Sequence, residues 1–252
     1  MNKTEQFQVS VAAGKRLIAK AVINMEQIKI ASQEHTVVII SGSTNGYVAE
    51  ELLKKIQQKD DFSKESFLRG VNVIHGAKIP KGKWSNTDVV IEKGIWVKGK
   101  TIFDVAADLG KNDIILKGAN AVQPDRKLAG IQIANPKLGT SGPILEAVLG
   151  RRVQLILPVG LEKRVFGNIV EMAELINDSS TSGTRLLPIT GTIITELEAI
   201  NILSGAHAEL IAAGGIFGAE GSCRFAVSGT DKQLTKMADI MHVVQKKPFF
   251  SR

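Results

Sequence analysis

The chain has 252 residues, of which 44% are hydrophobic, and this composition suffices for the core of one large domain or of two smaller ones. Lys and Arg exceed Asp and Glu by seven, but the positive residues are scattered in pairs and only 5% of the chain is aromatic, which argues against nucleic acid as a partner. With one cysteine, no apolar run of membrane-spanning length and no signal-peptide segment, the chain is expected to be cytoplasmic, without internal disulfides and without a membrane partner.

A helical pattern near the start of the chain leads into a strand, a short loop and a second helix. Apolar residues between 14 and 31 return to one face with a period of about 3.6, which predicts an amphipathic helix. Residues 36–40 are rich in β-branched types and predict a buried strand, and apolar residues at 52–56 recur at helical spacing. The loop between the strand and the second helix consists of Ser41, Gly42, Ser43, Thr44, Asn45 and Gly46.

This loop has the composition of an anion-binding site. Its small residues let the backbone approach a ligand, and its hydroxyl groups add hydrogen-bond donors. The first amides of the following helix have no partners within that helix and lie at its positive dipole end, so the loop is predicted to hold an anion, with phosphate the favoured candidate. The alternative is a tight connection in which Ser43 or Thr44 caps the helix.

Short elements are expected along the middle of the chain. Strands are predicted at 71–74, 88–91, 95–97, 113–116, 131–134 and 153–157, and helices at 102–109, 144–149 and 169–176. Each strand is bounded by turn residues. This order predicts an α/β sheet whose strands alternate with helices.

Polar residues follow two of these predicted strands directly. Lys117, Gly118 and Asn120 come after the strand at 113–116, which places a cation and an amide where open α/β sheets bind ligands. A solvated lysine at the end of a strand is the alternative interpretation of Lys117. Glu162 and Lys163 follow the strand at 153–157, where they either line the same cleft or pair with each other on the surface.

The C-terminal part of the chain has a different order of elements. The polar segment 177–183 is the clearest break in composition, and it predicts two domains, at 1–178 and 184–252. Beyond it, strands are expected at 186–189, 207–212 and 223–227, and helices at 195–203 and 232–244. This β-α-β-β-α order predicts a small ferredoxin-like α+β layer. The turn at 213–221 contains four glycines and is either a lid over the cleft or a hairpin connection.

Several common catalytic patterns are missing from the sequence. The four histidines show no close pairing, and together with the single cysteine they form no recognisable zinc site. Neither a G-x-S-x-G elbow nor a GxxxxGK[ST] loop occurs, and no helix directly follows the glycines of a dinucleotide-type turn. We therefore expect no metal and no cofactor.

The order of the motifs resembles that of ribose-5-phosphate isomerase type A. Residues 41–46, 88–91 and 115–118 occur in the same sequence order as the phosphate loop, the acidic loop and the Lys-Gly loop of that family. The opening helix at 15–25 and its hydroxyl-rich loop also resemble the effector-sensing domain of DeoR-type sugar repressors. Both families belong to a broad group that includes glucosamine-6-phosphate deaminases and CoA transferases. The resemblance covers residues 14–165 and implies a mostly parallel, Rossmann-like sheet followed by a small ferredoxin-like domain.

The resemblance also implies where an acid or base would be needed. Isomerases of this type carry an Asp-Gly-Ala-Asp loop where this chain has Ile91-Glu92-Lys93-Gly94, and they have a glutamate base soon after the Lys-Gly pair. Moving a proton between adjacent carbons requires a positioned carboxylate, for which Glu92, Asp125 and Glu162 are the candidates. Glu220 is the candidate for the covalent glutamate of CoA transferases.

The sequence thus predicts a site for a small anionic or phosphorylated ligand. The amides and hydroxyls of the loop would hold the anion, Lys117 would neutralise its charge, and Asn120 would orient the rest of the ligand. An enzyme of this kind would isomerise a sugar phosphate with Glu92 or Glu162 as acid or base. The alternatives are a non-catalytic sensor that signals through the second domain and acyl transfer from CoA. The sequence identifies neither the substrate nor the oligomeric state, and a homo-oligomer is one of the possible states.

Overall fold

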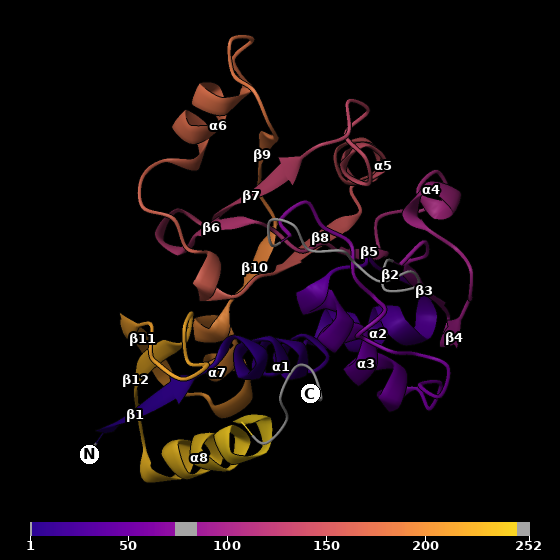
Figure 1. The fold of residues 1–252 in the computed structure, drawn as a ribbon. Coiled ribbons are helices and arrows are strands. Elements are labelled where there is room, and N and C mark those ends of the chain that lie inside the picture. The colour runs from indigo at the N-terminus through magenta and orange to yellow at the C-terminus, as the bar shows by residue number, and fades with distance from the viewer. Residues whose placement is uncertain (1, 74–84, 246–252) are drawn as a thin grey trace.

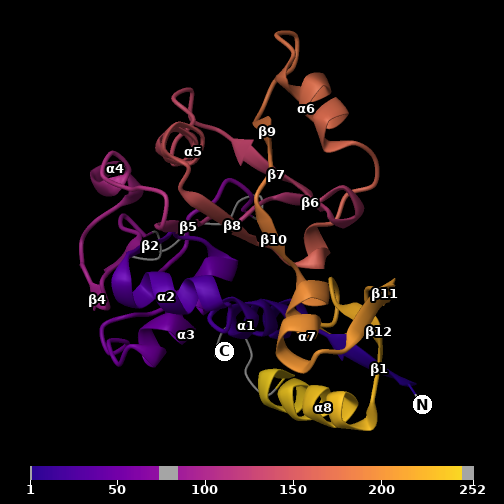
Figure 2. The same ribbon diagram turned by 180° about the vertical axis from the view of Figure 1, so that it is seen from behind.

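The structure, a computed structural model, describes residues 2–73 and 85–245 (Figure 1). It is a mixed α/β protein in which the described residues form one six-stranded mixed sheet and two three-stranded antiparallel sheets. Figure 2 shows the same arrangement from behind. None of the described helices combines the length and the apolar character needed to cross a membrane.

The six-stranded sheet contains the predicted strand that leads into the anion loop (residues 41–46) and the strand predicted at 113–116. Its first four strands run parallel, and the last two are antiparallel additions next to β2. The apolar side chains of β8, β5, β2 and β3 are buried, as the apolar runs predict, whereas Ile95 of β4 is exposed. The order is β10 (Thr192–Ile194), β8 (Gln154–Pro158), β5 (Ile114–Leu116), β2 (Thr36–Ile39), β3 (Val89–Glu92) and β4 (Ile95–Trp96).

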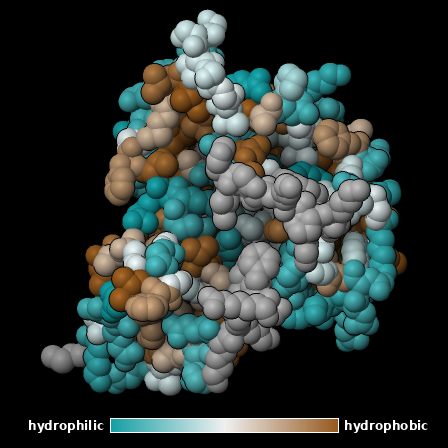
Figure 3. All heavy atoms as spheres, in the orientation of Figure 1, coloured by the Kyte–Doolittle hydropathy of each residue, from teal (hydrophilic) through white to brown (hydrophobic). Residues whose placement is uncertain are grey.

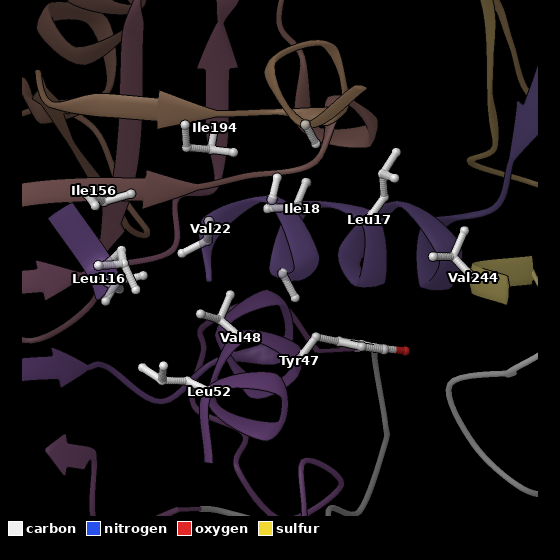
Figure 4. Packing of buried hydrophobic residues seen from close by; sticks show 14 of the residues in the cluster. Leu17, Ile18, Val22, Tyr47, Val48, Leu52, Leu116, Ile156, Ile194 and Val244 are labelled. Carbon is white, nitrogen blue, oxygen red and sulfur yellow. The ribbon is translucent and has the colours of Figure 1, made fainter. Parts of the chain in front are cut away.

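Helices α1 (Val11–Val22), α2 (Glu26–Glu34) and α3 (Ser43–Lys55) precede or follow β2 in the chain. The helix predicted over 14–31 is in fact two helices, because the chain turns at residues 23–25 and the side chain of Asn24 donates to the Lys20 carbonyl at 2.8 Å. Figure 4 shows α1 between α3 and the strands of the sheet. Leu17, Ile18 and Val22 of α1 are completely buried there.

A second sheet contains β6 (Ala121–Gln123), β7 (Leu128–Ile133) and β9 (Arg185–Ile189), with α6 (Ile169–Asn177) packed against it. The strand predicted at 186–189 is present, but it pairs with β7 and not with the C-terminal strands. The polar segment after α6 connects α6 to β9, and the side chain of Asn177 bonds both the amide and the carbonyl of Leu186 at 2.8 Å. The elements on the two sides of this segment are therefore in direct contact.

The third sheet has the order β1 (Lys3–Val9), β12 (Cys223–Gly229) and β11 (His207–Ala213), and it is accompanied by α7 (Glu196–Ser204) and α8 (Asp231–Gln245). The N-terminal strand β1 thus takes the place that the sequence assigned to 186–189. Most side chains of β1 are exposed, so its sequence lacks the apolar run that marks the other strands. In Figure 3, hydrophobic residues gather where β11 forms the edge of this sheet, and Ile211, Ile216 and Phe217 are exposed there.

Two shorter helices complete the described elements. The helix predicted at 102–109 is limited to α4 (Ile102–Val105), and the one at 144–149 is α5 (Ser141–Leu145), which continues into a π-helical turn, Glu146–Gly150. Residues 71–73 form a bend and irregular chain instead of the predicted strand, and Ile74 lies outside the described residues.

Candidate functional site

A cavity of about 810 Å³ lies where β2 and β5 end. Parallel neighbours in a sheet end on the same side, so the segments after these two strands converge on one wall. The facing wall comes from the end of β7 and from residues 138–141 at the start of α5. Residues 68–73 and 85–86 close a third side.

Eight of the eleven residues predicted for the site line this cavity, namely Ser41, Gly42, Ser43, Thr44, Asn45, Lys117, Gly118 and Asn120. The other three, Gly46, Glu92 and Glu162, are not among its described lining residues. Gly46 is buried within α3, where its amide donates to the Gly42 carbonyl at 2.8 Å. Its lack of a side chain serves packing, since a Cβ there would lie 3.2 Å from Cβ of Lys64.

The predicted carboxylates occupy other places. Glu92 pairs with Thr36 at the start of β2, the end of the strand remote from the anion loop, and its carboxylate lies 3.7 Å from Lys100. Glu162 is half-buried in the 3-10 turn Leu161–Lys163 beside the cavity. Asp125 and Glu220 are exposed. Lys163, which the sequence left open between cleft and surface, does line the cavity.

The anion loop is fixed by contacts that leave its helix end uncapped. The Asn45 side-chain amide donates to the carbonyls of Ile40 at 2.8 Å and Leu116 at 3.0 Å, which ties the ends of β2 and β5 together. The Gly42 amide donates to the Phe67 carbonyl at 3.1 Å. Gly42 is the N-cap of α3 and no described side chain caps the helix, so the alternative in which Ser43 or Thr44 caps it is wrong. The first-turn amides face the cavity region without a capping oxygen.

A buried carboxylate organises this wall; it begins the segment 88–91 that was matched to the acidic loop, but the sequence assigned it no role of its own. Asp88 accepts hydrogen bonds from the amides of Ser41 and Ile102, each at 2.9 Å, and from the Arg69 guanidinium at 3.0 Å. Arg69 also donates to the Ser85 carbonyl at 3.2 Å. Asp88 therefore holds the loop and a cavity-lining cation in one arrangement, and its oxygens are occupied by these donors.

The described lining is cationic. It includes Arg69, Lys117 and Lys163, and no carboxylate is among the described residues that line the cavity. Lys163 donates to the Ala119 carbonyl at 2.9 Å. The pKa of Lys117 is lowered to about 8, mainly by burial and in smaller part by the positive charges of Arg69 and Lys163, whereas Asp88 opposes the shift. Burial also lowers the pKa of Lys163. Charge of opposite sign is thus required to stabilise these ammonium groups.

Four buried polar atoms of the cavity lining have no hydrogen-bond partner among the described residues. They are Oγ of Ser41, Oγ1 of Thr44, Oδ1 of Asn45 and Oε1 of Gln132. Buried polar groups are normally paired, because an unpaired one costs about 1 to 3 kcal/mol. Two of these atoms are hydroxyls, which can donate, and two are amide oxygens, which accept. The remaining predicted residue, Asn120, already uses its Oδ1 to accept from the Gln132 amide at 3.0 Å.

A second cluster of charges lies behind the loop. Lys15 of α1 donates to the Ser43 hydroxyl at 3.1 Å, and burial lowers the pKa of Lys15. Glu196, the first residue of α7, accepts from the Leu161 amide at 2.8 Å. Burial and, to a smaller extent, the charge of Glu162 together raise the pKa of Glu196 to about 7. A Cβ at Gly14 would lie 2.3 Å from Oε1 of Glu196, so a larger residue there would displace the Glu196 carboxylate.

The fold and the site define an α/β protein with a cationic, partly desolvated cavity at the carboxyl ends of parallel strands. Its described residues include no group of three or more His, Cys, Asp or Glu that could hold a metal ion. Comparisons with protein-family models, with curated proteins and with solved structures each found no match.

Proposed function

We propose that this protein binds a small phosphorylated metabolite with several hydroxyl groups in the cavity at the ends of β2 and β5. The main support for this proposal is the composition of the cavity lining. It combines three cations and four unpaired buried polar atoms, with no carboxylate among its described residues. A phosphate would neutralise the cations and accept hydrogen bonds from the uncapped first turn of α3 and from the hydroxyls of Ser41 and Thr44.

The two amide oxygens argue for a ligand that is more than an inorganic anion. Asn45 donates both hydrogens of its amide group to backbone carbonyls, and no described residue donates to its Oδ1, which requires a donor. Oε1 of Gln132 requires a donor as well. A phosphate dianion has no hydrogen to offer them, whereas the hydroxyl groups of a phosphorylated sugar or polyol do.

The resemblance to ribose-5-phosphate isomerase type A and to its Rossmann-like sheet supports the same ligand class. Binding has stronger support than isomerisation by Glu92 or Glu162, because neither residue lines the described cavity.

A non-catalytic sensor is the second candidate, and the hydrogen bond between Lys15 of α1 and Ser43 favours it. Through α1, the ligand loop is joined to α7 and α8 of the C-terminal layer. Glu220 is exposed and is not among the described lining residues, which leaves CoA transfer without support.

The proposal is tested by thermal denaturation with a matched set of ligands. D-ribose 5-phosphate and ribitol 5-phosphate are expected to raise the melting temperature, because a ligand at a hundred times its Kd stabilises the folded state by about 2.7 kcal/mol. D-ribose, which lacks the phosphate, is expected to produce no shift. If neither phosphate raises the melting temperature, the proposed ligand class is wrong.

The variant Thr44→Val tests the role of an unpaired hydroxyl directly. Valine keeps the shape of threonine, so we expect binding of ribitol 5-phosphate to weaken about tenfold, while the free protein loses no stability. Thr36→Val, at the other end of β2, is the matched control and should leave the affinity unchanged. Isothermal titration calorimetry measures both affinities. Equal affinities for the two variants would show that the Thr44 hydroxyl does not contact the ligand.

A further inference from the structure

The amine of Lys117 differs from the other cations of the cavity. Lys163 is bonded to a carbonyl, and Arg69 is bonded to Asp88 and to a second carbonyl. No hydrogen bond or ion pair to Nζ of Lys117 is found within the described part of the chain, although the residue follows a fully buried strand. Its backbone is fixed at the cavity wall by the amide, which donates to the Ile156 carbonyl at 3.0 Å.

The surroundings of this amine favour its uncharged form. Desolvation and the charges of Arg69 and Lys163 bring its pKa to about 8, against an ordinary value of 10.5, and Asp88 is the one group that opposes them. At pH 7 roughly a tenth of the amine is then unprotonated, a fraction several hundred times larger than for an exposed lysine. A neutral amine is a nucleophile, and desolvation beside other cations is a known way to activate one.

The anion loop and Lys117 are also close enough to act on one small molecule. Ile39 and Leu116 are direct partners in the parallel ladder, and neighbouring strands lie about 4.8 Å apart. Ser41 lies two residues beyond the first of these partners, and Lys117 lies one residue beyond the second. A phosphate at the loop therefore leaves the carbon chain of a short sugar within reach of the amine.

We propose that Lys117 forms an imine with the carbonyl carbon of a phosphorylated aldose or ketose bound in this cavity. The inference rests on the proposed function and narrows its ligand class to carbonyl compounds. The nitrogen lone pair adds to the carbonyl carbon, and the oxygen takes up a proton to give a carbinolamine. Loss of one water molecule then forms the C=N bond. An imine withdraws electrons from the adjacent carbon and makes its hydrogen more acidic, which is the property that isomerisation or carbon–carbon cleavage requires.

Borohydride trapping tests the imine. The protein is incubated with D-glyceraldehyde 3-phosphate or D-ribose 5-phosphate and reduced with sodium borohydride, which delivers hydride to carbon while water protonates nitrogen. The expected product is heavier by the ligand mass less one oxygen atom, and peptide mapping should place it on Lys117. Phosphate-free D-glyceraldehyde should label Lys117 far less, because it lacks the group that the loop holds.

Two variants separate a specific imine from random modification of surface lysines. Lys117→Arg keeps the charge but cannot form an imine, so the label on the peptide containing residue 117 should be lost. Lys111→Arg replaces an exposed lysine and should leave that label unchanged. Labelling of Lys117 no greater than that of Lys111 would overturn the inference.

Phosphorylated ligands without a carbonyl group distinguish a failure of the imine inference from a failure of the proposed binding function. Glycerol 3-phosphate and ribitol 5-phosphate cannot form an imine, yet both should bind if the cavity accepts phosphorylated polyols. A thermal shift with these analogues but no reduced adduct on Lys117 would overturn the imine and leave the binding proposal intact. The absence of any shift would instead overturn the binding proposal on which the imine rests.

Discussion

Lys117 and Thr44 each have a polar group at the cavity wall that destabilises the protein when no ligand is bound. The ammonium group of Lys117 and the hydroxyl of Thr44 each forgo hydration at the cavity wall, and no described residue supplies a hydrogen bond in return. Natural proteins accept such costs at functional sites when a ligand recovers them. The two residues should therefore limit the stability of the free protein and contribute to its affinity.

Replacement of Lys117 by methionine is expected to stabilise the free protein. The folded-state pKa of about 8 lies below the ordinary 10.5, so the charged amine costs stability fully below pH 8, and this cost disappears as the pH rises towards 10.5. At pH 7, Lys117→Met should raise the free energy of unfolding by on the order of 2 kcal/mol, and the gain should shrink by pH 10. Urea denaturation at the two pH values measures it. Lys117→Arg, which keeps the charge, is the control, and a less stable Lys117→Met protein at pH 7 would contradict the prediction.

The cost of the buried Glu196 carboxylate to stability should have the opposite pH dependence. Its folded-state pKa of about 7 lies above the ordinary 4.5, so the carboxylate costs nothing below pH 4.5 and its full penalty is present above pH 7. Glu196→Gln should therefore be more stable than the natural protein at pH 8, by on the order of 3 kcal/mol, and equally stable near pH 4. The glutamine oxygen can still accept from Leu161. Urea midpoints at both pH values test this, and Glu174→Gln on the exposed face of α6 should show no such difference.

At the scale of elements, the contact between α1 and α3 depends on a buried ion pair as well as on apolar packing. Arg16 of α1 donates to Glu50 at 2.5 Å and to Glu51 at 2.6 Å, and its guanidinium lies 4.5 Å from the centre of the Tyr47 ring. Arg16 is 5% exposed and Glu50 is 8% exposed. Such a pair fixes the rotation of one helix against the other, because both carboxylates must meet one planar donor group.

Removal of Arg16 should be costly because Glu50 and Glu51 lose their shortest ion pairs and keep only lysine contacts of 3.7 to 4.0 Å among the described residues. Arg16→Ala is expected to lower the free energy of unfolding by about 3 to 5 kcal/mol, the usual result of breaking a buried pair. Lys29→Ala is the control, since Lys29 forms an exposed pair with Glu26 at 3.2 Å and should cost less than about 1 kcal/mol. Urea unfolding curves compare the two variants. A loss below 1 kcal/mol for Arg16→Ala would mean that the helices hold their arrangement without the pair.

The elements that the sequence predicted well are those whose residues carry a strong local pattern. The β-branched run at 36–40 and the apolar run at 113–116 are buried strands, and the loop between β2 and α3 lies at the cavity as expected. Thr195 caps α7 through a capping box with Glu198, a local signal as well. In each case neighbouring residues alone decide the structure.

Other features depend on contacts between residues far apart in the sequence, which no local pattern encodes. Arg69 and Gln132 reach the cavity from a loop and from the second sheet, and Asp88 contributes only because Ser41 and Ile102 bring their amides to it. The partner of β9 was assigned wrongly for the same reason. A single apolar strand fits several sheets, and its choice of β7 is made by tertiary packing.

At the scale of the whole molecule, the first and the last described strands pair in one sheet. Strand β1 pairs with β12 along its full length, from Lys3 opposite Gly229 to Val9 opposite Cys223. The helix that follows β1 is α1, which packs on α3 beside the cavity and on α7 and α8 of the C-terminal layer (Figures 1 and 4). The C-terminal layer is therefore continuous with the elements that carry the anion loop, and the first residues of the chain stabilise its last strand.

Deletion of residues 2–9 should expose this last strand and its thiol. Cys223 is 4% exposed beside Val9, and burial raises its pKa to about 11, so the natural protein should react very slowly with a thiol reagent at pH 8. Without β1, strand β12 becomes an unpaired edge and the thiol loses its cover, so the reaction should accelerate and the protein should aggregate more readily. The absorbance of the product of Ellman's reagent follows the reaction, and circular dichroism checks that the variant folds. Lys3→Ala, which removes only an exposed pair with Asp231, is the control, and a folded deletion variant whose thiol stays as slow as that of the control would show that β1 does not shield β12.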